Sequence, residues 1–122
     1  MKVILFFLFF LFLLHSANAI DCTDVDEYGH VVITGTTVDA SIVDEVRYCT
    51  TALTRVDMPE VTTIGILAFN YLSSLTAVTM PKVTTIEQYA FEGTALSNVD
   101  MPNVTTIGLG AFTYNYVLTT VT

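Results

Sequence analysis

One short motif recurs three times in this chain at an almost constant interval. Met58-Pro59, Met80-Pro81 and Met101-Pro102 follow one another at spacings of 22 and 21 residues. Each pair is followed by Val-Thr-Thr-Ile, then by Ala-Phe, and then by a Leu and a Val. A fixed period of about 20 to 50 residues is the signature of stacked repeats. Because one such unit cannot bury its own apolar side chains, the copies must stack to form a continuous core.

The apolar positions that recur in every copy define the expected core. Phe69, Phe91 and Phe112 should form its largest stack, and each ring should bury roughly 150–250 Å². Side chains alternate around Val-x-Met, which is the period of a strand. The proline after each methionine lacks a backbone donor and marks the end of that strand. Successive turns should therefore pair as parallel strands about 4.8 Å apart.

The pattern Leu-x-x-Val-x-Met-Pro, then Val-Thr-x-Ile, then Ala-Phe, resembles the BspA-like class of leucine-rich repeats. The resemblance covers residues 52–122. Met stands where Ile or Leu is more common, and the residues after each Phe are irregular. The resemblance implies a mainly β solenoid with a parallel sheet on one face and short turns or helical pieces on the other. It also implies secretion or surface display, and roles in adhesion.

The N-terminus has the three parts of a secretory signal peptide. Lys2 precedes an apolar run over residues 3–14, and small residues occupy positions 17 and 19. We expect residues 1–19 to be a signal peptide that is cleaved after Ala19. The alternative is an uncleaved anchor, but the 12-residue run is shorter than the roughly 20 residues of a spanning helix. The expected location is secreted or cell surface, without membrane insertion after cleavage.

The repeat pattern decays toward the N-terminus. We expect residues 20–48 to form an N-terminal cap and residues 49–122 to form the repeats, because terminal units of solenoids are usually atypical. Cys22 and Cys49 are the two cysteines, and in an oxidising compartment they predict one disulfide that ties down the cap. Free or intermolecular thiols are the alternative.

The C-terminus falls one residue before the next expected methionine. We therefore expect the repeat array to be open and truncated after Thr122, with an uncapped edge that invites self-association. Two further interpretations are a short secreted binder and a non-functional truncated gene copy.

Charge excludes two classes of partner. The chain has 12 acidic and 4 basic residues, a formal net charge of −8. Nucleic-acid binding depends on Lys and Arg, and anionic lipid attracts clusters of the same residues. We expect neither partner, and instead a protein or glycan on a cell surface or in extracellular matrix.

The polar strand positions are the candidate binding residues, since solenoids bind through such surfaces. When the repeats are aligned, the residues at one strand position differ from copy to copy, and we call this position the variable column. The position two residues later holds Asp57 and Asp100, which places both aspartates on one face. Together they predict a binding patch, with a merely solvated sheet edge as the alternative; the residues are Arg55, Asp57, Ala77, Thr79, Asn98, Asp100 and Thr120.

Two other features point to surface chemistry. Asn103-Val104-Thr105 is the one sequon for N-glycosylation, which makes Asn103 a candidate glycan site. Four tyrosines lie near the variable loops and are either interface anchors or half-buried loop residues; they are Tyr71, Tyr89, Tyr114 and Tyr116.

Catalytic and metal chemistry find little support in the sequence. His30 has no recognisable partner and is interpreted as a surface residue of the cap. Asp24-Val25-Asp26 and Gly29 resemble the start of a calcium loop, but Gly35 stands where the loop needs Glu. We expect no enzyme activity, metal or cofactor. A structural or ice-binding array of stacked threonine pairs is the alternative function.

Overall fold

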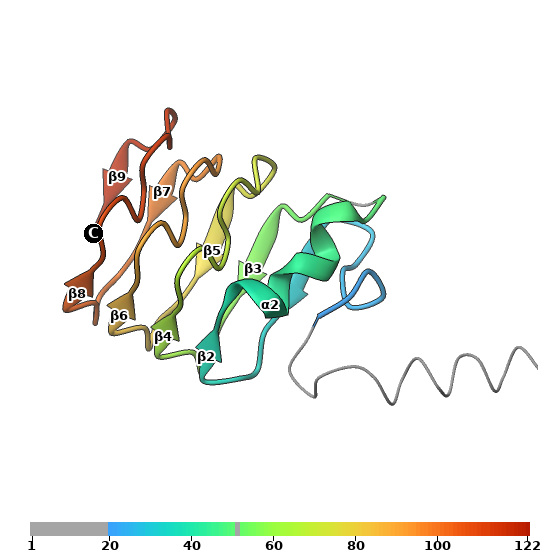
Figure 1. Ribbon diagram of the computed structural model, residues 1–122, viewed down its shortest axis with the longest axis horizontal. Helices are drawn as coiled ribbons and strands as arrows, with labels where there is room; N and C mark the ends of the chain where they lie inside the picture. Colours follow the sequence, from blue (N-terminus) through green and yellow to red (C-terminus); the bar gives the residue numbers. More distant parts are fainter. Residues whose placement is uncertain (1–19, 51) are drawn as a thin grey trace, which may run out of the picture.

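The chain winds as a solenoid with strands on two of its sides (Figure 1). The computed structural model describes residues 20–50 and 52–122, so the predicted signal peptide lies outside the described residues. Within that part of the chain, no helix is long and apolar enough to cross a bilayer. Strands make up most of the described secondary structure, with two short helical segments, which confirms the predicted mainly β solenoid.

The first ladder carries the strands that the Val-x-Met positions predict. β1 (His30–Val32), β3 (Arg55–Asp57) and β5 (Ala77–Thr79) pair in parallel. β7 (Asn98–Val99) and β9 (Thr120–Val121) pair in the same way and continue this side of the solenoid (Figure 1). Val56 and Val99 point inward and are buried, because side chains alternate along a strand.

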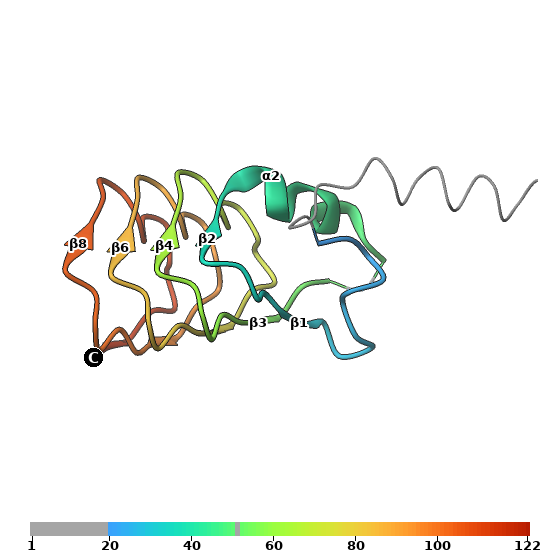
Figure 2. The same ribbon diagram turned by 90° about the horizontal axis from the view of Figure 1, so that it is seen from below.

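A second parallel ladder runs along another side of the solenoid (Figure 2). It consists of β2 (Thr37–Val38), β4 (Thr63–Ile64), β6 (Thr85–Ile86) and β8 (Thr106–Ile107). In β4 and β6 the isoleucine is buried and the threonine faces outward. The predicted parallel sheet on one face is present. The Val-Thr-Thr-Ile segments form a second parallel sheet, which the sequence interpretation did not include.

The predicted phenylalanine stack forms the centre of the core. The Phe69 and Phe91 rings are stacked with centroids 5.1 Å apart, and those of Phe91 and Phe112 are 5.4 Å apart. Met58 and Met80 are also buried, so the methionine before each proline fills the place of the usual Ile or Leu.

Threonine hydroxyls fasten each turn to the one before it. Thr84 Oγ1 donates to the backbone oxygen of Thr62, and Thr105 Oγ1 donates to that of Thr84. On the other side, Thr76 Oγ1 donates to the oxygen of Thr54. Each hydroxyl therefore bonds the equivalent residue of the preceding turn, which fixes the register of both ladders.

The N-terminal region lies at one end of the stack and contributes a strand to each ladder, β1 to the first and β2 to the second. α2 (Ala40–Val43) and η1 (Asp44–Tyr48) lie at this end (Figure 2). Asp39 starts α2 by accepting a hydrogen bond from the Ser41 N–H. The Ser41 hydroxyl bond lowers the pKa of the Asp39 carboxyl below its ordinary value. The predicted Cys22–Cys49 disulfide is confirmed.

The last described turn exposes apolar side chains at the opposite end. β8 and β9 each have one neighbouring strand in the described residues. Ile107 is 52% exposed, Leu109 71% and Val121 53%. The equivalent Ile64 and Ile86 of earlier turns are fully buried, so the following turn is what covers this position.

Candidate functional site

The predicted binding residues do lie together on the outer side of the first ladder. The register pairs Arg55 with Ala77 and Asp57 with Thr79. In the other strand pair, Asn98 is opposite Thr120, and Asp100 directly follows β7. We call these residues, together with His30, the polar face.

The N-terminal half of the polar face is a network centred on Asp57. Its carboxylate is 3.0 Å from His30 Nε2 and 3.0 Å from Arg55 Nη2. Arg55 Nη2 also donates to Thr79 Oγ1 at 3.2 Å. Partial burial raises the pKa of Asp57, but hydrogen bonds from the surrounding side chains outweigh this effect and hold the pKa below its ordinary value.

His30 belongs to this surface, although the sequence interpretation placed it alone in the cap. The parallel register aligns it with Arg55 as the first member of the variable column. Its Nδ1 also lies 3.5 Å from Asp26 Oδ2. The signal in the sequence was weak: His30-Val31-Val32-Ile33 matches Arg55-Val56-Asp57-Met58 in its apolar spacing, but no Met-Pro marks the register.

The C-terminal half of the polar face is less occupied by internal bonds. Asn98, Asp100 and Thr120 are exposed. Asp100 accepts one long hydrogen bond, 3.4 Å from Thr122 Oγ1, and within the described residues it has no ion-pair partner. Its carboxylate oxygens are therefore available to a partner, whereas those of Asp57 are largely engaged.

Asn103 occupies an exposed column with Glu60 and Lys82. The Lys82 ammonium and the Glu60 carboxylate form an ion pair at 2.7 Å. Asn103 Nδ2 donates to the Pro81 carbonyl at 2.7 Å. Glycosylation would replace one of the two Nδ2 hydrogens and leave the other able to donate, so this bond is compatible with a glycan, and glycosylation stays a prediction.

The acidic N-terminal cluster organises backbone turns. Asp21 Oδ1 accepts from the Thr23 N–H at 2.7 Å, and Asp26 Oδ1 accepts from the Tyr28 N–H at 2.9 Å. The His30 N–H bond is the largest cause that lowers the pKa of Asp26. No group of three or more metal-binding side chains occurs in the part of the chain that the structure describes.

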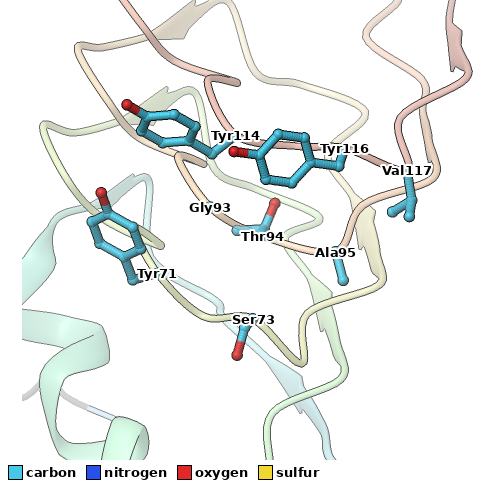
Figure 3. Close-up of a pocket in the computed structure, with 8 residues that line it drawn as sticks. All are labelled: Tyr71, Ser73, Gly93, Thr94, Ala95, Tyr114, Tyr116 and Val117. Carbon is cyan, nitrogen blue, oxygen red and sulfur yellow. The ribbon is translucent and has the colours of Figure 1, made fainter.

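A separate hollow lies beside the loops that follow the phenylalanines (Figure 3). Its volume is about 620 Å³. Three tyrosine rings and small residues line it, and the complete lining is Tyr71, Ser73, Gly93, Thr94, Ala95, Tyr114, Tyr116 and Val117. The three rings are 60%, 53% and 87% exposed for Tyr71, Tyr114 and Tyr116. Tyr71 and Tyr114 are therefore about half-buried, which agrees with one of the two interpretations of these tyrosines, whereas Tyr116 is mostly exposed.

We call this hollow the tyrosine hollow. Left-handed backbone conformations at Tyr71 and Tyr114 orient two of its rings. Tyr71, Gly93 and Tyr114 occupy the same position in successive turns, with φ of 55°, 65° and 60°. Only glycine adopts this conformation without cost. A Cβ on Gly93 would lie 2.7 Å from Tyr71 Cδ1, so the Tyr71 ring fills the space that the missing side chain leaves.

Glu92 stands at the edge of the tyrosine hollow. The Tyr71 hydroxyl donates to Glu92 Oε1 at 3.4 Å. The Glu92 charge is the largest cause that raises the pKa of Tyr71 above its ordinary value. Tyr114 and Tyr116 add to the same shift, and their ring centroids lie 6.2 Å apart.

Comparison with known proteins agrees with the repeat geometry. The family described as BspA type leucine rich repeat region (6 copies) matches residues 40–122. A leucine rich cell surface protein of Faecalibacterium prausnitzii A2-165, solved at 1.80 Å, is 45% identical to this chain, with a TM-score of 0.55. The match covers 57% of this chain and 19% of that one, so the chain spans about a fifth of its neighbour's length. No curated protein matches. The stacked Met-Pro units and the family match over most of the sequence together place the chain in the BspA type leucine-rich repeat family.

Proposed function

We propose that this protein is a secreted or surface-displayed binding module that recognises a protein or glycan through its polar face, without catalysis. The observation that carries the proposal is the contrast within that face. The ladder holds a variable column of side chains in fixed register. In its C-terminal half, Asp100 has no ion pair in the described part of the chain, and the hydrogen bonds from Thr122 to Asp100 and from Thr119 to Asn98 are long, at 3.4 and 3.5 Å. A rigid scaffold with variable polar positions is how solenoids present binding surfaces.

Charge supports a basic or neutral partner. The chain carries a net charge of −8, and the polar face adds Asp57 and Asp100 to the exposed surface. Complementary charge speeds association and fixes orientation more than it adds affinity. The cell-surface description of the structural neighbour supports extracellular display.

The test is binding to immobilised extracellular-matrix proteins and to a glycan array. Asn98→Ala and Asp100→Asn should weaken capture by about fivefold or more each, if they act as central contacts. Glu27→Gln is the matched control for Asp100→Asn, because it removes one charge from an exposed residue of the cap. Equal losses for the two charge variants would show that only net charge matters and would contradict a site on the polar face.

The ice-binding alternative receives less support from the geometry. The hydroxyls of Thr62, Thr84 and Thr105 donate to backbone oxygens of the preceding turn. One outward column remains, which consists of Thr37, Thr63, Thr85 and Thr106. A single column matches an ice lattice in one dimension, whereas an ice plane needs two.

A further inference from the structure

The tyrosine hollow has a lining that favours one kind of ligand. Its eight lining residues include no Lys, Arg or His, and the Glu92 carboxylate lies at the Tyr71 hydroxyl. Nothing in the lining would neutralise an anion. Arg47 lines a smaller neighbouring hollow of about 120 Å³ that shares Tyr71, and there its guanidinium is paired with Asp44 at 2.9 Å.

The floor offers few free hydrogen-bonding groups. The Gly93 N–H donates to the Thr113 oxygen at 2.8 Å, and the Ala95 N–H donates to the Leu75 oxygen at 3.0 Å. The Thr94 hydroxyl donates to Asn115 Oδ1. A sugar needs several directional hydrogen bonds as well as an aromatic platform, so this floor suits a sugar poorly.

Two of the rings form an angle that suits a compact cation. The Tyr114 and Tyr116 rings are inclined by 42° with centroids 6.2 Å apart, so they form two sides of an angle rather than a flat platform. Tyr71 lies two turns before Tyr114, which corresponds to roughly 9–10 Å of backbone separation at the spacing of paired strands. A cation in the angle between Tyr114 and Tyr116 can lie within about 6 Å of both ring centroids, the range of cation–π attraction. Figure 3 shows the three rings around the Gly93–Ala95 segment.

We propose that the tyrosine hollow binds an organic ammonium group, with a quaternary trimethylammonium head as its preferred form. The three phenol rings supply the cation–π surface, and Glu92 supplies the negative charge. Gly93 lets the Tyr71 ring lie against the backbone of the next turn, since any side chain there would meet that ring. This site is independent of the polar face, and either one can fail without the other.

The experiment compares choline with 3,3-dimethylbutan-1-ol, its neutral isostere, by following the tyrosine ring resonances of the full protein in NMR titrations. We expect choline and tetramethylammonium to shift the resonances of Tyr71, Tyr114 and Tyr116 saturably, and the isostere to bind at least fivefold more weakly. Nα-acetyl-Nε-trimethyl-lysine amide carries the same quaternary head on a peptide backbone, so comparing it with choline separates a peptide source from a free ammonium compound. Equal binding of choline and the isostere would overturn the proposal and indicate a merely apolar pocket. A response to a methyl glycoside without one to choline would overturn it in favour of a sugar.

Single substitutions test whether choline binds in the tyrosine hollow. Tyr116→Ala should weaken choline binding about two- to fivefold, the effect of losing one exposed ring. Tyr48→Ala is its matched control, because that tyrosine is 89% exposed and lies outside the hollow. Glu92→Gln should also weaken choline binding while leaving binding of the isostere unchanged. Both Tyr variants are at exposed positions and should fold; an unchanged choline affinity in Tyr116→Ala and Glu92→Gln would contradict the site.

Discussion

The phenylalanine stack yields a quantitative prediction for stability. Phe91 has a ring on each side, whereas Phe69 and Phe112 each have one stacked neighbour among the described residues. A ring pair contributes about 0.5–1.5 kcal/mol beyond the area it buries. Replacing each Phe by Leu keeps most of the apolar contact but removes the pairs. Phe91→Leu should therefore cost about 1–3 kcal/mol, and Phe112→Leu about 0.5–1.5 kcal/mol.

Differences in burial also affect how much unfolding free energy the three variants should lose. Phe69 and Phe91 are fully buried, so Leu leaves unfilled volume at both places, whereas Phe112 is partly exposed. The expected order of cost is Phe91→Leu, then Phe69→Leu, then Phe112→Leu. Urea unfolding followed by circular dichroism, with the m-value compared among variants, measures these differences. Equal losses of unfolding free energy in Phe112→Leu and Phe91→Leu would contradict a stabilising contribution from the second ring pair of Phe91.

Three further predictions follow from the cap, the polar face and the open end. Reducing the disulfide should lower the unfolding free energy by about 3 kcal/mol at constant pH, because it closes a loop with a sequence separation of 27; an unchanged melting temperature would contradict this role. The lowered pKa of Asp57 contributes stability that is complete above about pH 4 and is lost as the pH falls through the native pKa. Asp57→Asn should therefore flatten the fall of unfolding free energy below about pH 4 in urea titrations, and an unaltered slope would refute the assignment. A protein that consists of residues 20–122 exposes the edge at β8 and β9 and should self-associate in sedimentation experiments, and Leu109→Lys should reduce this association; a monodisperse protein of these residues would contradict this interface.

The repeat period predicted the features that recur in every turn. The phenylalanine stack, the buried methionines and the polar columns all follow from aligning residues by Met-Pro, because stacking brings equivalent residues into register. The disulfide followed from having two cysteines in a chain with a predicted secretion signal. These inferences need no knowledge of the turns between the strands.

The missed features depend on backbone conformation or on short segments. The second ladder has strands of two residues, which are too short for alternation to be visible in the sequence. His30 lacked a Met-Pro marker, so its place opposite Arg55 appeared only through the register. The tyrosine hollow depends on left-handed φ at Tyr71 and Tyr114, where non-glycine residues are uncommon and the sequence gives no warning.

The alternation of glycine and aromatic residues limits how this array can be rearranged. Gly110 accommodates the Tyr89 ring of the turn before it, just as Gly93 accommodates Tyr71. Deleting the unit that contains Gly93 would set the Cβ of Tyr114 against the Tyr71 ring. The repeats therefore cannot be exchanged freely, because each glycine must face the aromatic ring of the preceding turn. Recombination that reorders or removes a repeat must also restore these glycine–ring contacts.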